Sequence, residues 1–146
     1  MKRTLATHPS PLATRDIPRG FRFSATACGL KKKPGALDLA LMVSDVPASA
    51  AAVFTTNLVK AAPVRVSQWH LKQSRGRMRA IIINAGNANC STGGDGVPAA
   101  GVTANMVGHR LNCKPAEVIV CSTGVIGVPL PVKKILQAVP ELVGSL

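Results

Sequence analysis

Large aliphatic residues recur at every second position over residues 37–43, the first stretch of the chain with a regular pattern. Residues 1–35 show no sustained periodicity, carry Pro and Gly punctuation, and are predicted to be irregular. From Leu37 to Val43 every second residue is Leu or Val, which predicts a strand that ends at the Asp45–Pro47 turn. A second strand is predicted over 50–56, close enough to pair with the first as a hairpin.

Helical and strand patterns then alternate to the end of the chain. The predicted elements are a helix over 68–72 with Ser67 as its N-cap, a strand over 79–84, a helix over 98–111, a strand over 117–121 and a helix over 131–139 that Pro140 cuts or bends. On the 98–111 helix, Val102, Met106 and His109 share one face. The order β-β-α-β-α-β-α predicts an α/β or α+β layered fold, with no internal repeat and no linker between domains.

Composition narrows the class of protein. The chain has 146 residues, of which 47% are hydrophobic and 3% are aromatic, so the core is expected to be aliphatic and to belong to one domain or one lobe. No apolar run approaches the roughly 20 residues that a membrane-spanning helix needs. No apolar segment follows the basic start Met1–Arg3, so neither a secretion signal nor a membrane partner is expected, and the predicted location is the cytoplasm.

Positive charge dominates the sequence. There are 18 Lys and Arg residues against 6 acidic residues, a formal net charge of +12, and the cations gather in the N-terminal third and over 60–79. Such charge suits a nucleic acid, an acidic partner chain or simply a solvated face. Trp69, Phe21 and Phe23 are the only aromatic residues near a basic cluster, too few for stacking of single strands, so no nucleic-acid partner is expected.

The cysteines and histidines do not form a metal-ligand pattern. Cys28, Cys90, Cys113 and Cys121 contain no C-x-x-C pair, and His8, His70 and His109 lie near none of them in sequence. No metal is therefore predicted. Free thiols are the simpler interpretation, and a disulfide framework, which requires an oxidising compartment, stays open by count.

Two loops follow predicted strands, at the position where open sheets carry ligand loops. The first runs from Asn84 through the Asn-rich turn to Gly96, and it fits either an anion-binding loop of exposed backbone N–H groups or a structural turn with self-bonding Asn side chains. It matches neither a dinucleotide fingerprint nor a phosphate-binding Walker loop.

The second loop is Ser122-Thr123-Gly124. A hydroxyl and unhindered backbone N–H groups at a strand end are suitable donors for a developing oxyanion, although a tight β–α turn explains the same residues. Gly124 and Gly127 also have the spacing of a KH RNA-binding loop, but apolar residues lie between them and argue against it.

An attacking group is not evident. Four residues in the two loops have nucleophilic side chains: Cys90, Ser91, Thr92 and Ser122. A hydrolytic nucleophile needs a neighbouring base, and no motif places a histidine beside any of them. The residues alone therefore indicate half of an active site, with donors but no nucleophile.

At these loops the chain resembles the N-terminal α-chain part of the ornithine acetyltransferase family (glutamate N-acetyltransferases). The matching segments, which together cover about residues 20–138, are Gly20-Phe21, Cys28–Lys31, Asp38–Leu41, Ser44-Asp45, Val53–Asn57, Val59–Val64, Asn84–Asn89 and Ser122–Leu130. The family's Ala-Cys-Thr-Gly after the Asn-rich turn reads Cys90-Ser91-Thr92-Gly93 here.

The resemblance implies a mechanism. Members cut themselves before a threonine, and the new N-terminal threonine of the β chain moves an acetyl group from N-acetylornithine to glutamate with its own α-amine as base. By the same resemblance Thr123 and Gly124 form the oxyanion hole. No metal or organic cofactor is implied, and acetyl-CoA is an optional co-substrate.

The resemblance also implies a division of the chain and its partners. Residues 1–19 are expected to be an irregular basic segment, and 20–146 part of an αββα sandwich with two sheets between helices. The nucleophile and the substrate-binding residues are expected beyond Leu146, on a β chain in an assembly of two α and two β chains. Alone, the chain is expected to be inactive. The alternatives are an inactive fragment, or a basic binding module for RNA or an acidic partner.

Overall fold

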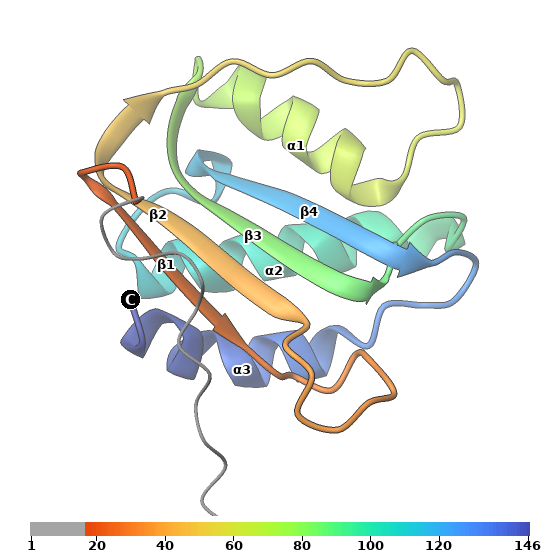
Figure 1. Ribbon diagram of the computed structural model, residues 1–146. Helices are drawn as coiled ribbons and strands as arrows, with labels where there is room; N and C mark the ends of the chain where they lie inside the picture. Colours follow the sequence, from red (N-terminus) through yellow and green to blue (C-terminus); the bar gives the residue numbers. More distant parts are fainter. Residues whose placement is uncertain (1–16) are drawn as a thin grey trace, which may run out of the picture.

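One four-stranded sheet organises the molecule, with strand order β1-β2-β3-β4 (Figure 1). The computed structural model describes residues 17–146. The elements are β1 (Phe21–Thr26), β2 (Leu39–Ser49), α1 (Ala62–Gln73), β3 (Arg77–Asn87), α2 (Gly96–Arg110), β4 (Val118–Val125) and α3 (Val132–Gly144), with short 3₁₀ turns at Gly93–Asp95 and Pro115–Glu117. The mixed α/β class is confirmed, and from α1 onward the elements follow in the predicted order, whereas the two strands before α1 are not the two that were predicted.

The strands combine an antiparallel meander with one parallel pair. β1 pairs with β2 and β2 with β3 in antiparallel fashion, whereas β3 pairs with β4 in parallel through the α2 crossover. Because β3 and β4 are parallel, their carboxyl ends, and the loops that follow them, lie at the same edge of the sheet.

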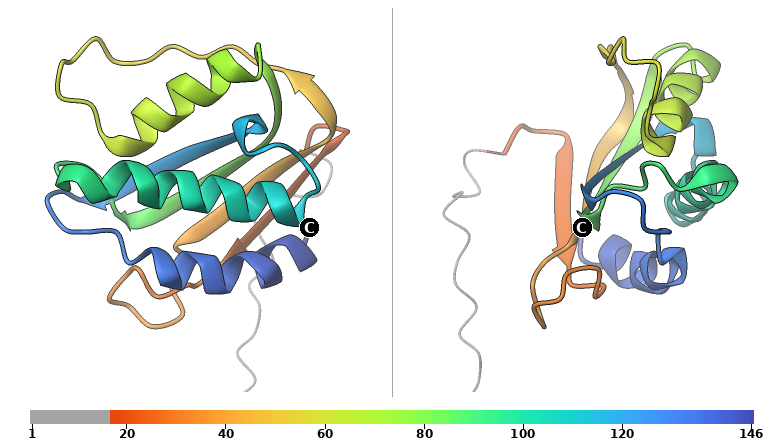
Figure 2. Two further views of the ribbon diagram at one scale, coloured as in Figure 1. Left: turned by 180° about the vertical axis from the view of Figure 1, so that it is seen from behind. Right: turned by 90° about the vertical axis from the view of Figure 1, so that its right-hand side faces the viewer.

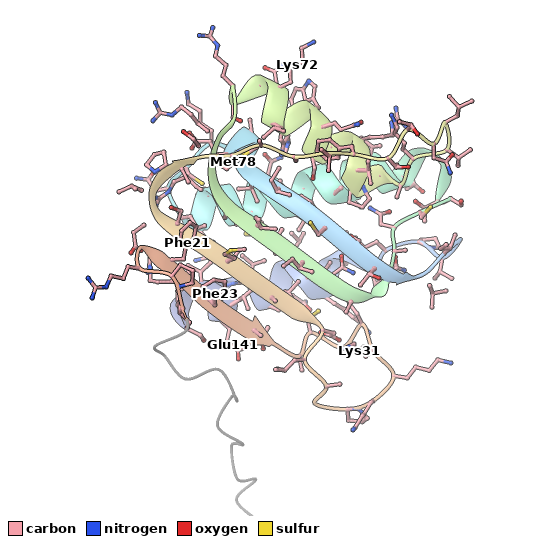
Figure 3. The ribbon with its side chains drawn as sticks, turned by 45° about the horizontal axis from the view of Figure 1, so that its top comes forward. Phe21, Phe23, Lys31, Lys72, Met78 and Glu141 are labelled. Carbon is pink, nitrogen blue, oxygen red and sulfur yellow. The ribbon has the colours of Figure 1, made fainter. Side chains whose placement is uncertain are left out.

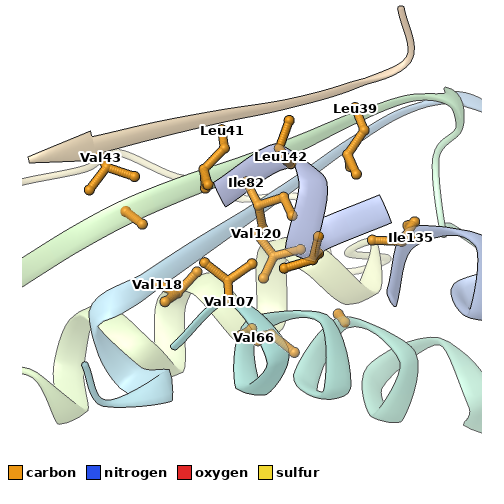
Figure 4. Packing of buried hydrophobic residues seen from close by; sticks show 14 residues of the cluster. Leu39, Leu41, Val43, Val66, Ile82, Val107, Val118, Val120, Ile135 and Leu142 are labelled. Atoms are coloured by element: carbon orange, nitrogen blue, oxygen red, sulfur yellow. The ribbon is translucent and has the colours of Figure 1, made fainter. Parts of the chain in front are cut away.

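All three helices cover a single face of the sheet, as the side view in Figure 2 shows. The core lies between them and consists of aliphatic residues, as the composition predicted. Its members, several of which Figure 4 labels, are Leu39, Leu41, Val43, Val66, Ala80, Ile82, Ala100, Ala104, Val107, Val118, Val120, Ile135, Val139 and Leu142. Alternate residues of β2, β3 and β4 enter this core, which follows from the two-residue period of a strand.

The second face of the sheet carries apolar side chains that no helix of residues 17–146 covers. The registers place Phe21 and Phe23 of β1 on the same face as Met42, Ile81 and Ile119 of the neighbouring strands. Phe21 is 36% and Phe23 44% exposed, and Figure 3 shows both on β1. The described residues therefore form one sheet and one helical layer, and the second sheet of the expected sandwich is not among them.

The hairpin is the main correction to the predicted elements. The partner of the Leu-rich strand is β1, which lies inside the segment predicted to be irregular, and the strand predicted over 50–56 is extended chain without a partner. After Ser49 the chain leaves the sheet, so Val53 is fully exposed. A strand needs a neighbour to satisfy its backbone groups, and β1 occupies that place. The part of the predicted 1–19 segment before residue 17 lies outside the described residues.

The predicted helices are present, with different bounds and packing. Ser67 is not an N-cap: α1 begins at Ala62 with a proline in its first turn, and Ser67 lies buried in mid-helix. On α2 the buried face contains small residues such as Ala100 and Ala104, which allow close packing, whereas Val102 is 43% exposed. The face shared by Val102, Met106 and His109 is therefore not the buried face of α2.

Pro140 does not cut α3. The helix continues to Gly144 with Pro140 on its exposed side, where water can serve the carbonyl group that the proline leaves without a donor. The buried stripe of α3 is Ile135, Val139 and Leu142, a helical spacing. No helix within residues 17–146 has both the length and the apolar character needed to cross a membrane.

Candidate active site

Thr123 and Gly124 lie at the exposed end of β4, directly beside the end of β3. The register pairs Ala85 with Thr123 and Gly86 with Gly124. Both candidate residues are exposed, and within residues 17–146 no hydrogen bond engages the Thr123 hydroxyl. Thr123 and Gly124 still pair with β3, because β4 runs on to Val125 rather than stopping before Ser122. Both residues therefore lie near the end of a strand, as the local pattern predicted, but inside β4 rather than in a loop that follows it.

Two glycines allow three backbone segments to meet at this point. Gly124 has φ of 131°, and a Cβ there would overlap the carbonyl carbon of Gly86 and lie 2.5 Å from the Asn87 nitrogen. Gly86 has φ of 112°, and a Cβ there would lie 3.1 Å from the Leu30 carbonyl. Side chains rarely adopt such φ values, so both positions require glycine. Residues Cys28–Lys31, which we call the Leu30 segment, thus pack on β3 at Gly86, and β3 in turn packs on Gly124.

Asp38 holds the Leu30 segment in place. Its carboxylate is 3% exposed and accepts backbone N–H bonds from Cys28 (2.7 Å), Leu30 (2.6 Å) and Lys31 (2.9 Å). The Asp38 carbonyl also accepts the Ala85 N–H at 2.8 Å, which ties the same residue to β3. Sequence patterning did not single out Asp38, because a polar residue between two leucines fits a solvent-facing strand position equally well.

Burial and hydrogen bonds act in opposite directions on Asp38. Desolvation raises the pKa of the carboxyl group, but the backbone donors of Lys31, Cys28 and Leu30 and the Cys28 thiol outweigh it, so the pKa lies below its usual value. Burial, the hydrogen bond to Asp38 and its charge raise the pKa of the Cys28 thiol to about 12. The carboxylate is therefore ionised and Cys28 is a neutral thiol at physiological pH.

The Asn-rich turn is a network of side-chain hydrogen bonds. Asn84, Asn87 and Asn89 are all buried. The Asn84 amide donates to the Asn87 carbonyl at 2.8 Å, and the Asn89 amide donates to the Gly96 carbonyl at 2.8 Å. Asn87 reaches across the site edge, with its amide 3.0 Å from the Val128 carbonyl. The self-bonding Asn side chains of the second interpretation are therefore observed, but Asn84–Asn87 belong to β3, and the chain leaves the strand only after Asn87.

The four candidate nucleophiles lack an activating base within residues 17–146. The Ser122 hydroxyl donates to the side-chain oxygen Oδ1 of Asn84 at 2.6 Å, and the Thr92 hydroxyl donates to Oδ1 of Asn89 at 3.1 Å. The Cys90 sulfur and the Ser91 hydroxyl are 3.8 Å apart. Within the described part of the chain no hydrogen bond joins any of the four to a histidine or a carboxylate. The site residues therefore offer donors and a rigid scaffold, but no activated attacking group.

The histidines have structural surroundings in the described chain. His70 is buried in α1, with Nδ1 2.7 Å from the Val118 carbonyl oxygen. Beside it, the Ser67 hydroxyl donates to the Val120 carbonyl at 2.9 Å and accepts the Val120 N–H at 3.1 Å. β4 is an edge strand, so these two side chains satisfy backbone groups that would otherwise be unpaired. His109 lies near the end of α2, and His8 lies outside the described residues.

The described residues contain neither a metal-ligand cluster nor a disulfide. Between residues 17 and 146 no three His, Cys, Asp or Glu side chains lie close enough together to hold a metal ion. All four cysteines are free thiols, as predicted, and burial raises the pKa of both Cys113 and Cys121.

Fold and site together define a mixed α/β domain with an exposed Thr-Gly pair near the end of a parallel edge strand. Comparison with known proteins identifies the lineage: the chain belongs to the ArgJ family, whose sequence model matches residues 22–146. The arginine biosynthesis bifunctional protein ArgJ of Geobacter sulfurreducens is 51% identical over 128 residues, which are 88% of this chain and 32% of that protein. The chain spans about a third of the length of the curated relatives it matches.

Solved structures support the same assignment. The ornithine acetyltransferase of Mycobacterium tuberculosis, solved in complex with ornithine, superposes with a TM-score of 0.80 at 45% identity, over 87% of this chain and 67% of that chain. The ArgJ protein of Bacillus halodurans gives a TM-score of 0.78 at 37% identity, over 83% of this chain and 62% of that chain. One fungal relative, from Cryptococcus neoformans, is named as mitochondrial and is 46% identical over 89% of this chain and 28% of its own length.

Proposed function

We propose that this chain supplies the oxyanion hole of an ornithine acetyltransferase that moves an acetyl group from N-acetylornithine to glutamate in arginine biosynthesis. The observation that carries the proposal is the exposed Thr123–Gly124 pair, which glycine packing fixes against β3. The Thr123 hydroxyl and the Gly124 N–H donate to the acetyl carbonyl oxygen as it becomes negatively charged. A fixed donor of this kind stabilises the transition state more than the substrate.

The reaction proceeds in two acyl transfers. A threonine hydroxyl attacks the acetyl carbon of N-acetylornithine, and its proton passes to the threonine α-amine. The α-ammonium group then gives this proton to the leaving nitrogen as the C–N bond breaks, which releases ornithine and restores the free α-amine. The α-amine of glutamate then attacks the resulting threonine ester and releases the threonine hydroxyl. Both steps place negative charge on the same carbonyl oxygen, so one pair of donors serves both.

The nucleophile belongs to a separate segment in this proposal. None of the described candidate nucleophiles has a base beside it, which supports a threonine supplied by a β chain that self-cleavage generates. The apolar second face of the sheet supports a further layer of protein there, as in an αββα sandwich. On this basis the chain alone is inactive, the substrate-binding residues lie mainly on the β chain, and two α and two β chains assemble.

Co-substrate and location complete the proposal. Acetyl-CoA serves as a second acetyl donor, which agrees with the word bifunctional in the relatives' names, and no metal or organic cofactor takes part. The bacterial relatives support a cytoplasmic enzyme.

A chimeric enzyme tests the donor role. Residues 22–146 would replace the matching segment of the Geobacter sulfurreducens relative, and release of ornithine from N-acetylornithine would be measured. We expect Thr123→Ala to lower kcat by about 100- to 1000-fold, the usual effect of losing one oxyanion donor, with little change in KM. Self-cleavage and chain assembly, followed by denaturing gel and size-exclusion chromatography, should persist.

Thr26→Ala is the matched control. Thr26 lies on β1, at the opposite edge of the sheet, and its hydroxyl makes only a 3.5 Å contact with Glu141. The control should keep turnover within about twofold of the unmodified chimera. Equal turnover in the Thr123→Ala and Thr26→Ala enzymes would refute the oxyanion role.

A further inference from the structure

The outer face of α1 carries an exposed aromatic ring among cations. Arg65, Trp69 and Lys72 follow one another at helical steps of four and three, so they share one face, opposite the buried Val66 and His70. Figure 3 places Lys72 on α1, away from the sheet. Together with the preceding segment these residues line a hollow of about 720 Å³, whose lining is Leu58, Val59, Lys60, Arg65, Gln68, Trp69 and Lys72. We call this hollow the α1 surface.

Trp69 is exposed to an unusual degree for a large aromatic residue. Its side chain is 58% exposed, and the ring centroid lies 5.4 Å from that of the buried His70 at an interplanar angle of 48°. Tryptophan has the largest apolar surface of any side chain, and leaving it in water forgoes that burial. An exposed indole held in place by its helix is a platform on which a flat ring can stack.

The cations of the α1 surface are available to a ligand. Within residues 17–146 the one ion pair is Arg22–Asp45, so Lys60, Arg65 and Lys72 have no acidic partner there. No acidic residue lines the hollow. Three positive charges around one hollow, in a chain of net charge +12, attract a ligand with several negative charges.

We propose that the α1 surface binds a nucleoside phosphate, with the base stacked on Trp69 and the phosphates on Lys60, Arg65 and Lys72. The indole accounts for the aromatic part of the ligand, and the three cations account for two or more phosphate groups. An acidic peptide would use the cations but leave the indole without a flat partner. A nucleic acid strand would need further rings for successive bases, and Trp69 is the only aromatic residue in the lining.

Two classes of molecule carry this chemistry: a free nucleotide, and a coenzyme thioester that would bind through its nucleotide end. The site lies on the outer face of α1, and its residues are distinct from Thr123 and Gly124. The proposal does not depend on the acetyl transfer, because binding is measured without turnover.

The composition of the chain supplies a direct reporter. Trp69 is the only tryptophan and there is no tyrosine, so intrinsic fluorescence excited at the indole band reports on this ring alone. We expect ADP to quench it in a saturable manner, and adenosine or inorganic tripolyphosphate to bind more weakly than ADP. Coenzyme A is the second probe: binding tighter than ADP identifies the coenzyme as the source, and equal binding identifies the nucleotide alone.

Variants separate stacking from charge. Arg65→Ala with Lys72→Ala should weaken ADP binding roughly two- to thirtyfold, and the matched double variant Lys32→Ala with Lys33→Ala, in the exposed loop before β2, should leave it unchanged. By calorimetry, Trp69→Ala should weaken binding roughly five- to 150-fold, and Trp69→Phe should recover part of the loss.

The proposal would be overturned if ADP showed no saturable binding, or if both double variants weakened ADP binding equally. It would also be overturned if an oligonucleotide bound far more tightly than ADP and Trp69→Ala left the affinity for the oligonucleotide unchanged. Circular dichroism confirms that each variant is folded. The same titrations by calorimetry in the Geobacter sulfurreducens chimera provide the measurement if the separate chain does not fold.

Discussion

Replacement of Asp38 by asparagine tests the most connected polar residue of the structure. The buried carboxylate serves three backbone donors, Cys28 through one oxygen and Leu30 and Lys31 through the other. An asparagine amide has one acceptor oxygen. The amide orientation that preserves more hydrogen bonds points this oxygen at the Leu30 and Lys31 N–H groups. The NH₂ group then faces the Cys28 N–H, which is left without an acceptor.

The expected loss follows from this count. One buried unsatisfied donor costs about 1–3 kcal/mol, and two bonds that change from charged to neutral lose about 1 kcal/mol each. Asp38→Asn should therefore lower the free energy of unfolding by about 3–5 kcal/mol, a large part of the roughly 5–15 kcal/mol typical of a domain.

Dependence on pH gives the prediction a second readout. The folded pKa of Asp38 lies below its unfolded value, so the ionised carboxylate stabilises the fold fully above the unfolded pKa of about 4. That contribution is lost as pH falls through the lower, folded pKa. The difference in stability between the unmodified chain and Asp38→Asn should therefore shrink below about pH 4 and stay constant from pH 5 to 7.

Urea unfolding followed by circular dichroism measures both effects. Asp45→Asn is the matched control, because Asp45 is half-exposed and pairs with Arg22 on the surface, where an ion pair contributes about 0–1 kcal/mol. A loss below about 1 kcal/mol for Asp38→Asn, or losses of equal size in the two variants, would refute the account of Asp38 as the anchor of the Leu30 segment.

The remaining predictions concern β4. Gly124→Ala places a methyl group against the Gly86 backbone and should destabilise the chain by about 2–4 kcal/mol in urea unfolding, with a loss of turnover in the chimera; unchanged values would contradict the close packing. Ser67→Ala leaves the Val120 N–H and C=O unpaired and should cost about 2–4 kcal/mol, whereas Ser145→Ala, at the exposed end of α3, should change stability by less than about 0.5 kcal/mol. Equal losses at the two serines would show that the edge bonds do not matter.

The spacing of apolar residues was sufficient to predict a strand and its buried face where every second residue, or a continuous run of residues, is apolar. Alternation predicted that Leu39, Leu41 and Val43 share the buried face, and a continuous apolar run predicted the central strand β3. The same reasoning failed for β1, where Phe21 and Phe23 alternate with polar residues inside a segment rich in basic residues and Pro. It also failed over 50–56, which has strand-forming residues but no neighbouring strand to pair with.

The residues of the candidate site also fall into two groups, those that the sequence indicated and those that only the structure revealed. Thr123 and Gly124 were found because a Thr-Gly pair after an apolar strand is a local signal. Asp38 was not found as part of the site, and the contacts of Gly86, which lies in the first candidate loop, were not foreseen. These contacts reach across long sequence separations: Gly86 lies against Gly124 and Leu30, and the Asp38 carbonyl accepts the Ala85 N–H. Only folding brings these segments together, and no spacing of residues along the chain predicts the contacts between them.

By itself the sequence determined the alternation of helices and strands from α1 onward, the aliphatic core, the position of the Thr-Gly pair near the end of a strand and, through its motifs, the resemblance to a family. These properties depend on residues close together in the chain, where side-chain period and turn chemistry act directly. Tertiary structure decided which strand completes the hairpin, which face of α2 is buried and how Asp38, Gly86 and Gly124 form one support for the site. Those outcomes depend on competition among distant segments for the same hydrogen-bonding edge and the same buried space, which the packed structure resolves.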